Sequence, residues 1–180
     1  MRFEEREIRW TTWDGEHEET VRLGFENGGW TAEGTVEGLD ITYVLRFDEA
    51  WRTRQFLLFR DLDEPDLWLA TDGAGRWGET NGSGRDDLTG CSDIVLSCTP
   101  FTTAAAVMRL RASGQHNESL SVAMVDVETL GVTVHHHDLT HLGNDQWRHL
   151  SHTTGRSYQF LVDEFGLTVD EPQRFRRSDR

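Results

Sequence analysis

The chain has 180 residues, with 32 Asp or Glu against 18 basic residues, so its formal net charge is −14 at pH 7. All 18 basic residues are Arg, and an acidic chain without a basic patch excludes both a nucleic-acid surface and electrostatic adhesion to an anionic membrane. No apolar run approaches the roughly 18 residues of a membrane span, and residues 1–7 lack the apolar core of a signal peptide, so we expect a cytoplasmic protein.

The acidic surplus without lysine predicts a protein adapted to high salt. Molar salt screens surface charges over about 3 Å, which relieves the self-repulsion of a strongly acidic surface. A GC-rich genome would also replace Lys by Arg, but it would not explain the surplus of carboxylates. We therefore expect a halophile's protein that loses its fold in dilute buffer.

The length of the chain is typical of one domain with its own hydrophobic core. No segment rich in Pro, Gly or Ser divides the sequence, so we expect one domain over residues 1–180 that ends in a frayed, charged tail over residues 174–180. Cys91 and Cys98 do not have the spacing of a zinc or redox motif. We expect both to be small buried or half-buried side chains in a reducing compartment.

Alternation of apolar and polar residues predicts strands along most of the chain. Turn residues recur every 8–15 positions between these segments, which is typical of an all-β sandwich, barrel or roll. The apolar residues that share a face in four of the predicted strands are Val21, Leu23 and Phe25; Ile41, Tyr43, Leu45 and Phe47; Leu120, Val122 and Met124; and Tyr158, Phe160 and Val162.

Only the segment 99–110 favours a helix, with Thr99 as its N-cap and Pro100 at its first position; a strand is the alternative. About twelve or more strands in one domain must curl, close or split into two sheets. We therefore expect an all-β fold, a curled antiparallel sheet in the form of a spiral β-roll or open barrel, with at most one short helix. The concave face of such a sheet can make an apolar ligand site.

The segment Trp51–Arg54 combines an aromatic side chain with two cations. As a strand it places Trp51 and Thr53 on one face and Arg52 and Arg54 on the other. An inward arginine would suggest anion recognition, because a buried cation needs a partner. The alternative is an outward pair that bridges surface carboxylates.

The histidine-rich segment 135–152 is the densest chemical feature of the sequence. On a strand, His135 and His137 share one face and His136 takes the other, and His149 on a neighbouring strand could join the first two as a metal ligand. The alternative is a solvated face. No catalytic motif emerges elsewhere: there is no EF-hand spacing, no Walker lysine and no G-x-S-x-G sequence.

Several segments, in order, resemble the signature of one family. They are Gly90-Cys91-Ser92-Asp93-Ile94, Thr99-Pro100-Phe101-Thr102, Arg109-Leu110, Trp51-Arg52-Thr53-Arg54, Asp72-Gly73 with Trp77, Val162 to Leu167, and Pro172 to Arg176. Across residues 15–177 the chain is thus similar to the "Putative glycolipid-binding" family. It departs from the family pattern at Val95, Thr103, Ala106, Met108 and Glu171. Its central segment therefore carries fewer polar residues than the family pattern does.

The resemblance implies a spiral β-roll similar in shape to carriers that move lipoproteins between bacterial membranes, and it supplies no catalytic residues. The leading hypothesis is therefore a non-catalytic protein that binds a lipid-like or amphiphilic small molecule and needs no cofactor. Trp51, Trp77 and Phe101 would form an apolar wall. Arg54 and Arg109 would meet an anionic head group or would pair with Asp93.

Two other classes of function remain open at this point. One is a metal-dependent β-barrel enzyme built on His135, His137 and His149. The other is a protein-interaction module that uses an exposed sheet edge or an aromatic patch. The sequence does not indicate an oligomeric state.

Overall fold

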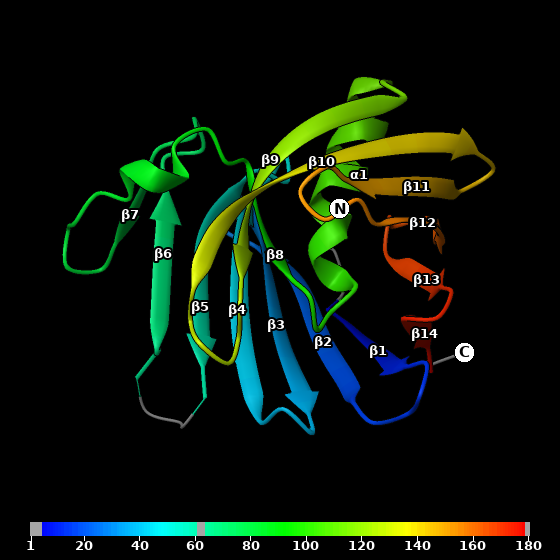
Figure 1. Ribbon diagram of the computed structural model, residues 1–180, viewed down its shortest axis with the longest axis horizontal. Helices are drawn as coiled ribbons and strands as arrows, with labels where there is room; N and C mark the ends of the chain where they lie inside the picture. The colour runs from blue at the N-terminus through cyan, green and yellow to red at the C-terminus, as the bar shows by residue number, and fades with distance from the viewer. Residues whose placement is uncertain (1–4, 61–63, 179–180) are drawn as a thin grey trace.

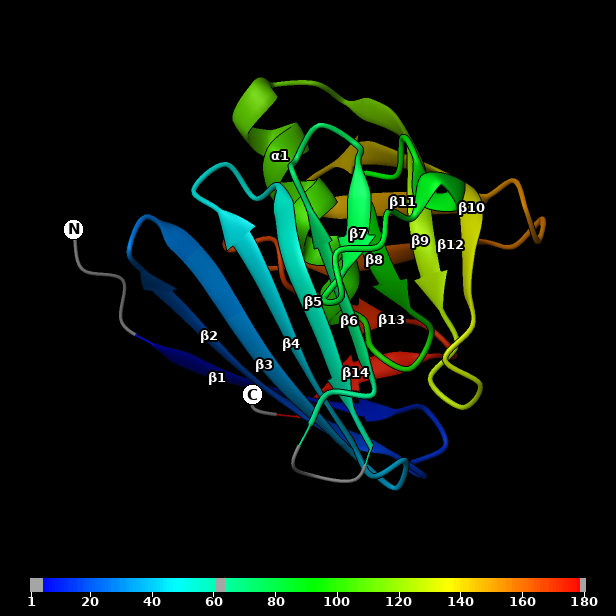
Figure 2. The same ribbon diagram turned by 90° about the vertical axis from the view of Figure 1, so that its left-hand side faces the viewer.

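The computed structural model describes residues 5–60 and 64–178, and in them fourteen strands form one curled sheet that does not close (Figures 1 and 2). The predicted fold class is confirmed. The strands are β1 (Arg6–Thr12), β2 (Glu18–Glu26), β3 (Gly29–Glu37), β4 (Ile41–Asp48), β5 (Thr53–Phe59), β6 (Leu67–Thr71), β7 (Trp77–Glu79), β8 (Asp93–Leu96), β9 (Asn117–Val125), β10 (Val132–Gly143), β11 (Gln146–Ser151), β12 (Ser157–Val162), β13 (Thr168–Glu171) and β14 (Phe175–Arg177).

The strand order places the two ends of the described chain in the middle of the sheet. The order is β7-β6-β5-β4-β3-β2-β1-β14-β13-β12-β11-β10-β9-β8, so β1 pairs with β14 and the edges come from mid-chain (Figure 1). Trp10 lies opposite Arg177, and Thr12 lies opposite Phe175. The frayed tail predicted over residues 174–180 is therefore wrong for residues 175–177, because β14 pairs on both sides; residues 179–180 lie outside the described part.

One pair of neighbouring strands departs from the antiparallel pattern. β8 and β9 run parallel, and between them lie the 3₁₀ turn η2 (Phe101–Thr103) and the helix α1 (Ala104–Ser113). A parallel pair needs a crossover of this length, since a short hairpin can join only antiparallel strands. The other 3₁₀ turn of the described chain, η1 (Asp86–Leu88), precedes β8.

The helix predicted over residues 99–110 is confirmed, with a shifted start. The Thr99 hydroxyl accepts the backbone N–H of Phe101 at 2.9 Å, as a capping side chain does, but residues 101–103 form the tighter 3₁₀ turn before the α-helix begins. The helix ends at Gly114, whose φ of 69° is the left-handed conformation that glycine adopts without steric cost.

The helix lies between two clusters of buried apolar side chains. Ala104 and Ala105 belong to the larger cluster, which β1–β6 and β8 help to build, whereas Val107 and Leu110 belong to a cluster with β9–β12. Small side chains on α1 allow the sheet to approach the helix from both sides. No helix of the described chain is long and apolar enough to span a membrane.

The predicted apolar strand faces are confirmed as the inner face of the sheet. Most of their residues are buried, and the exceptions are Phe25, Met124 and Tyr158, which are half-buried. Two of these exceptions, Met124 and Tyr158, line a cavity, which is where the curled sheet leaves space unfilled.

Candidate functional site

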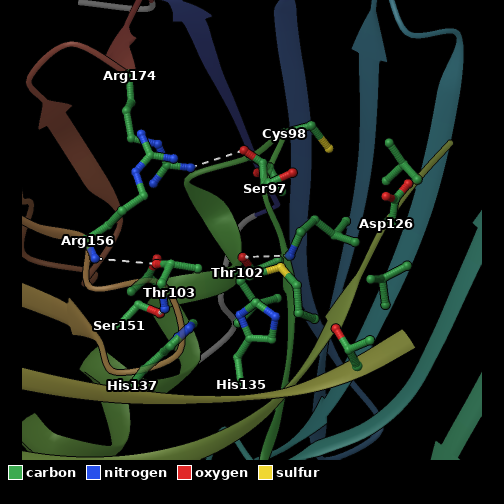
Figure 3. A pocket seen from close by; sticks show the side chains of 18 of the residues that line it. Ser97, Cys98, Thr102, Thr103, Asp126, His135, His137, Ser151, Arg156 and Arg174 are labelled. Carbon is green, nitrogen blue, oxygen red and sulfur yellow. Dashed lines mark hydrogen bonds between the residues drawn. The ribbon is translucent and has the colours of Figure 1, made fainter. Parts of the chain in front are cut away.

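A cavity of about 680 Å³ lies between the segment that links β8 to η2 and the strands β9 to β13 (Figure 3). Its volume is within the roughly 300–1,000 Å³ that small-molecule sites occupy. A second cavity of about 30 Å³ adjoins it and shares Val95, Thr102 and Tyr158 with it. The larger cavity is therefore the candidate functional site.

The cavity wall combines apolar side chains with many hydroxyl groups. The apolar residues come from the loop after β3, from β8, from β9 and the turn after it, and from β12. The hydroxyls come from the segment after β8 through η2, and from β10 and β11 with their adjoining turns. The apolar lining residues are Leu39, Val95, Leu96, Met124, Val125, Val127 and Tyr158, and the hydroxyl-bearing ones are Ser97, Thr99, Thr102, Thr103, Thr129, Thr133, Ser151 and Thr154.

His135, His137 and His149, predicted as alternative metal ligands, line this cavity together. The ring centres of His135 and His137 are 6.0 Å apart, and those of His137 and His149 are 4.5 Å apart, both edge to face. His136 points away and lies 3.1 Å from the Ser121 hydroxyl, as strand alternation predicted. In the described residues no group of three or more His, Cys, Asp or Glu is arranged to hold a metal ion, so a metal-dependent enzyme is not favoured.

The buried histidines of the cavity are neutral at pH 7. Burial lowers the pKa of His137 to about 4 and the pKa of His149 to about 3, and neighbouring imidazoles lower both further. The His149 ring stacks on Tyr158 at 4.7 Å between ring centres. Neutral imidazoles give the wall polar groups without adding charge.

Two arginines on one flank carry the positive charge of the cavity (Figure 3). Arg174, between β13 and β14, forms an ion pair with the buried carboxylate of Glu171 and donates a hydrogen bond to the Ser97 carbonyl at 3.1 Å. Arg156, in the β11–β12 turn, is exposed, and its guanidinium forms no ion pair or side-chain hydrogen bond within residues 5–60 and 64–178. Asp126 and Glu128 line another part of the wall.

A buried carboxyl group lies behind the cavity. Glu19 on β2 accepts hydrogen bonds from the Tyr43 hydroxyl and from the Thr99 hydroxyl, both at 2.7 Å. Burial raises the pKa of Glu19 to about 7, against the opposing effect of these two hydrogen bonds. Because Thr99 also lines the cavity, its hydroxyl connects the cavity wall to the buried carboxyl of Glu19.

Asp93 and Arg109, two of the predicted ligand contacts, pair with each other. The Arg109 guanidinium donates to both carboxylate oxygens of Asp93, at 2.8 and 2.6 Å, and also to the Trp51 carbonyl at 3.0 Å. Asp93 lines the smaller cavity, whereas Arg109 lines neither of the two. The pairing with Asp93 that the sequence left open is thus present for Arg109, whereas Arg54 pairs with Asp48 instead.

The three predicted aromatic contacts are buried in the core. Trp51 stacks on Trp30 with 4.6 Å between ring centres, and the Trp77 indole N–H donates to the Cys91 carbonyl at 2.9 Å. Phe101 is also fully buried, directly before the lining residues Thr102 and Thr103. None of the three lines either cavity.

Arg52 and Arg54 point outward. Their side chains are 57% and 41% exposed, and both donate to Asp48 Oδ2, at 3.0 and 3.1 Å. The alternative in which the pair bridges a surface carboxylate is therefore the one that the structure shows. Thr53 and Trp51 are both buried, but the strand begins only at Thr53, and Trp51 precedes it with a φ of 61° instead of continuing a strand face.

Arg156 and Arg174 were not among the predicted ligand contacts. Both lie in turns; Arg174 falls within the segment Pro172 to Arg176 that carries the family resemblance, whereas no motif includes Arg156. Strand alternation contained a signal for one of them, because Arg156 lies two residues before Tyr158 and so continues the inward face of β12.

Comparison with known proteins places the chain in one family. The family described as "Putative glycolipid-binding" matches residues 7–177. A solved structure of a DUF1089 family protein from Pseudomonas aeruginosa is similar, with a TM-score of 0.70 and 22% identity over 99% of this chain and 95% of that one. No curated protein sequence matches. At this identity the solved structure shows a shared fold.

Proposed function

The chain belongs to the "Putative glycolipid-binding" family, and from this premise we propose that it binds a lipid-like or glycolipid-like small molecule without catalysing a reaction on it. The cavity of about 680 Å³ is the observation that carries the proposal. Its apolar side chains suit an acyl or alkyl chain, and its hydroxyl and imidazole groups suit a polar head group.

The ligand contacts in this proposal are the residues that line the cavity. The residues predicted from sequence support them from behind: Phe101 anchors η2, and the Asp93–Arg109 pair joins β8 to α1 and to the backbone of Trp51. Arg54 and Trp77 instead lie away from the cavity: Arg54 binds Asp48 and the Asp72 carbonyl, and Trp77 binds the Cys91 carbonyl.

Native mass spectrometry of untagged protein, followed by organic extraction, tests the proposal. We expect an adduct of lipid mass in a stoichiometric amount. Thr133→Trp fills the cavity from an exposed strand position and should reduce the adduct at least tenfold, whereas Thr35→Trp, on an exposed position of β3, should retain it. An apo mass after loading with a panel of lipids would contradict the proposal and favour a protein-interaction module instead.

We also propose that the chain acts as one domain in the cytoplasm of a halophile. Cys91 and Cys98 are both free thiols, as in a reducing compartment. The charge of −14 and the absence of lysine support adaptation to high salt.

A further inference from the structure

The two arginines of the cavity wall approach each other from different turns (Figure 3). Arg174 is held by Glu171 and by the Ser97 carbonyl, so its charge is largely compensated within the protein. The Arg156 guanidinium forms no ion pair or hydrogen bond with a described carboxylate, although it lies near enough to Glu171 to oppose the rise that burial causes in the pKa of that carboxyl. The flank therefore holds two guanidinium groups and one buried carboxylate, which leaves one positive charge without a counterion.

The backbone of the β11–β12 turn fixes the base of the Arg156 side chain. The Ser151 N–H donates to the Arg156 carbonyl at 2.8 Å, and the Gly155 N–H donates to the Ser151 carbonyl at 2.8 Å. The Arg156 N–H donates to the Thr154 hydroxyl at 3.4 Å. Arg156 thus projects from a closed turn, so no backbone entropy has to be lost there when the side chain binds a ligand.

The charge of the cavity is polarised. Asp126 lies on the part of the wall away from the arginines (Figure 3), and Glu128, two residues further along the same turn, also lines the cavity. The N–H groups of Thr129 and Glu128 donate to Asp126 at 3.0 and 2.9 Å, which lowers the pKa of Asp126 and keeps it charged. An anion is repelled there and attracted at Arg156. Apolar side chains such as Leu96 and Val125 lie on the same wall.

We infer that the ligand is an amphiphile whose head group is an oxyanion, a phosphate, sulfate or carboxylate, bound by Arg156 beside Arg174. A guanidinium presents two parallel N–H donors that match two oxygens of such a group. A neutral sugar cannot form this charge-assisted pair of hydrogen bonds. This inference rests on the proposed function, since it places the head group of the same ligand. Arg156 thus takes the head-group role that the sequence had assigned to Arg54 and Arg109, because those two arginines are already paired with carboxylates.

Calorimetric titration with probes that share a ten-carbon chain tests the inference. The probes are decyl phosphate, decyl maltoside and decyltrimethylammonium, each below its micellar concentration and in one NaCl concentration at which circular dichroism shows the folded protein. Inorganic phosphate is the fourth probe. We expect decyl phosphate to bind at least tenfold more tightly than each of the other three.

Substitution of Arg156 assigns the head group. Arg156→Gln should weaken decyl phosphate binding roughly tenfold or more and leave decyl maltoside binding unchanged, because a charged hydrogen bond is lost. Arg148→Gln is the matched control: it removes the same charge from an exposed position of β11 that does not line the cavity, and it should change neither. Arg156→Glu should reverse the preference toward decyltrimethylammonium.

Three results would overturn the inference, and they differ in what they say about the proposed function. If decyl maltoside binds as tightly as decyl phosphate and Arg156→Gln affects neither, the anionic head group is wrong and the lipid site stands. If inorganic phosphate binds as tightly as decyl phosphate, the site takes a free anion and no lipid chain. If none of the decyl probes binds, both the inference and the proposed function fail.

Discussion

At the scale of single residues, Glu19 is a buried group whose ionisation makes the stability of the protein depend on pH. Its carboxyl is buried between the Tyr43 and Thr99 hydroxyls, and burial raises its pKa from 4.5 to about 7. Below pH 4.5 the carboxyl is protonated in both the folded and the unfolded chain. Between pH 4.5 and 7 the unfolded chain releases the proton while the folded chain retains it, so this group lowers the free energy of unfolding as the pH rises.

Glu19→Gln should remove this pH dependence. The amide oxygen can accept from Tyr43 and the amide nitrogen can donate to Thr99, so the hydrogen bonds survive without the ionisation. A pKa shift from 4.5 to about 7 corresponds to about 3 kcal/mol, so we expect the variant to be more stable than the parent chain by up to that amount at pH 8 and equal to it near pH 4.

Urea unfolding at a series of pH values measures this effect. Glu26→Gln, on an exposed position of the same strand, is the control and should leave the difference near zero at every pH. A stability difference for Glu19→Gln that does not change from pH 4 to pH 8 would contradict the assignment.

Residues also set the limit of what the sequence predicts about the site. The alternation on β10 placed His135 and His137 on one face of the strand, and the structure confirms this. Alternation does not predict which other elements lie against that face. Asp93 and Arg109 were recognisable as important, yet whether they meet a ligand or each other depends on tertiary distance. The pair lies 16 residues apart along the chain and closes at 2.6 Å only in the fold.

At the scale of elements, β3 and β4 depend on a close approach of a side chain to a glycine. Gly34 lies opposite Tyr43, and the Tyr43 ring covers it so closely that an added Cβ would fall 2.2 Å from the ring. A glycine within a strand often marks such an approach. The Tyr43 ring has no free space to move into, since it is buried and its hydroxyl binds Glu19.

Gly34→Ala should therefore destabilise the protein by about 1–3 kcal/mol, the usual cost of overpacking a core. Gly24→Ala is the matched control, because it lies on the neighbouring strand β2 and an added Cβ there meets no atom within 4 Å. Thermal or urea denaturation of both variants measures the difference. Equal stability of the two variants would show that the Tyr43 ring moves aside at no cost.

The crossover between β8 and β9 shows where element-level prediction stops. The sequence favoured a helix from Thr99, Pro100 and the following alanines, with a strand as the alternative, and it predicted a strand after this segment, over residues 120–124. It did not predict that β8 and β9 lie next to each other in parallel. Strand pairing depends on which apolar faces meet in three dimensions, and the alternation within a strand is the same for both directions.

At the scale of the whole molecule, the surface charge of −14 opposes the compact state. The opposition is also local: Glu18 on β2 lies directly opposite Glu37 on β3, and like charges in facing positions destabilise a sheet. Salt screens such exposed pairs within a few ångströms.

We expect the urea midpoint of unfolding to rise steadily as NaCl is increased from 0.1 to 3 M, and the protein to lose its fold on dialysis into water. Sucrose solutions of matched osmolality provide the control for effects that do not depend on charge, and they should raise the midpoint less than the salt does. A far-UV circular dichroism spectrum that stays unchanged after dialysis from molar salt into water would contradict this prediction.

The pairing of β1 with β14 has a consequence for the order of events when the protein is made. Within the sheet, this pair is the only hydrogen-bonded link between the arm β1–β7 and the arm β8–β14 in the described chain. β14 is synthesised after every other strand of the described chain, so a nascent chain that lacks residues 175–177 cannot make the strand pairing that joins the two arms of the sheet. Until β14 is made, β1 and β13 each lack a neighbouring strand, and these unpaired edges are exposed to chaperones and to aggregation.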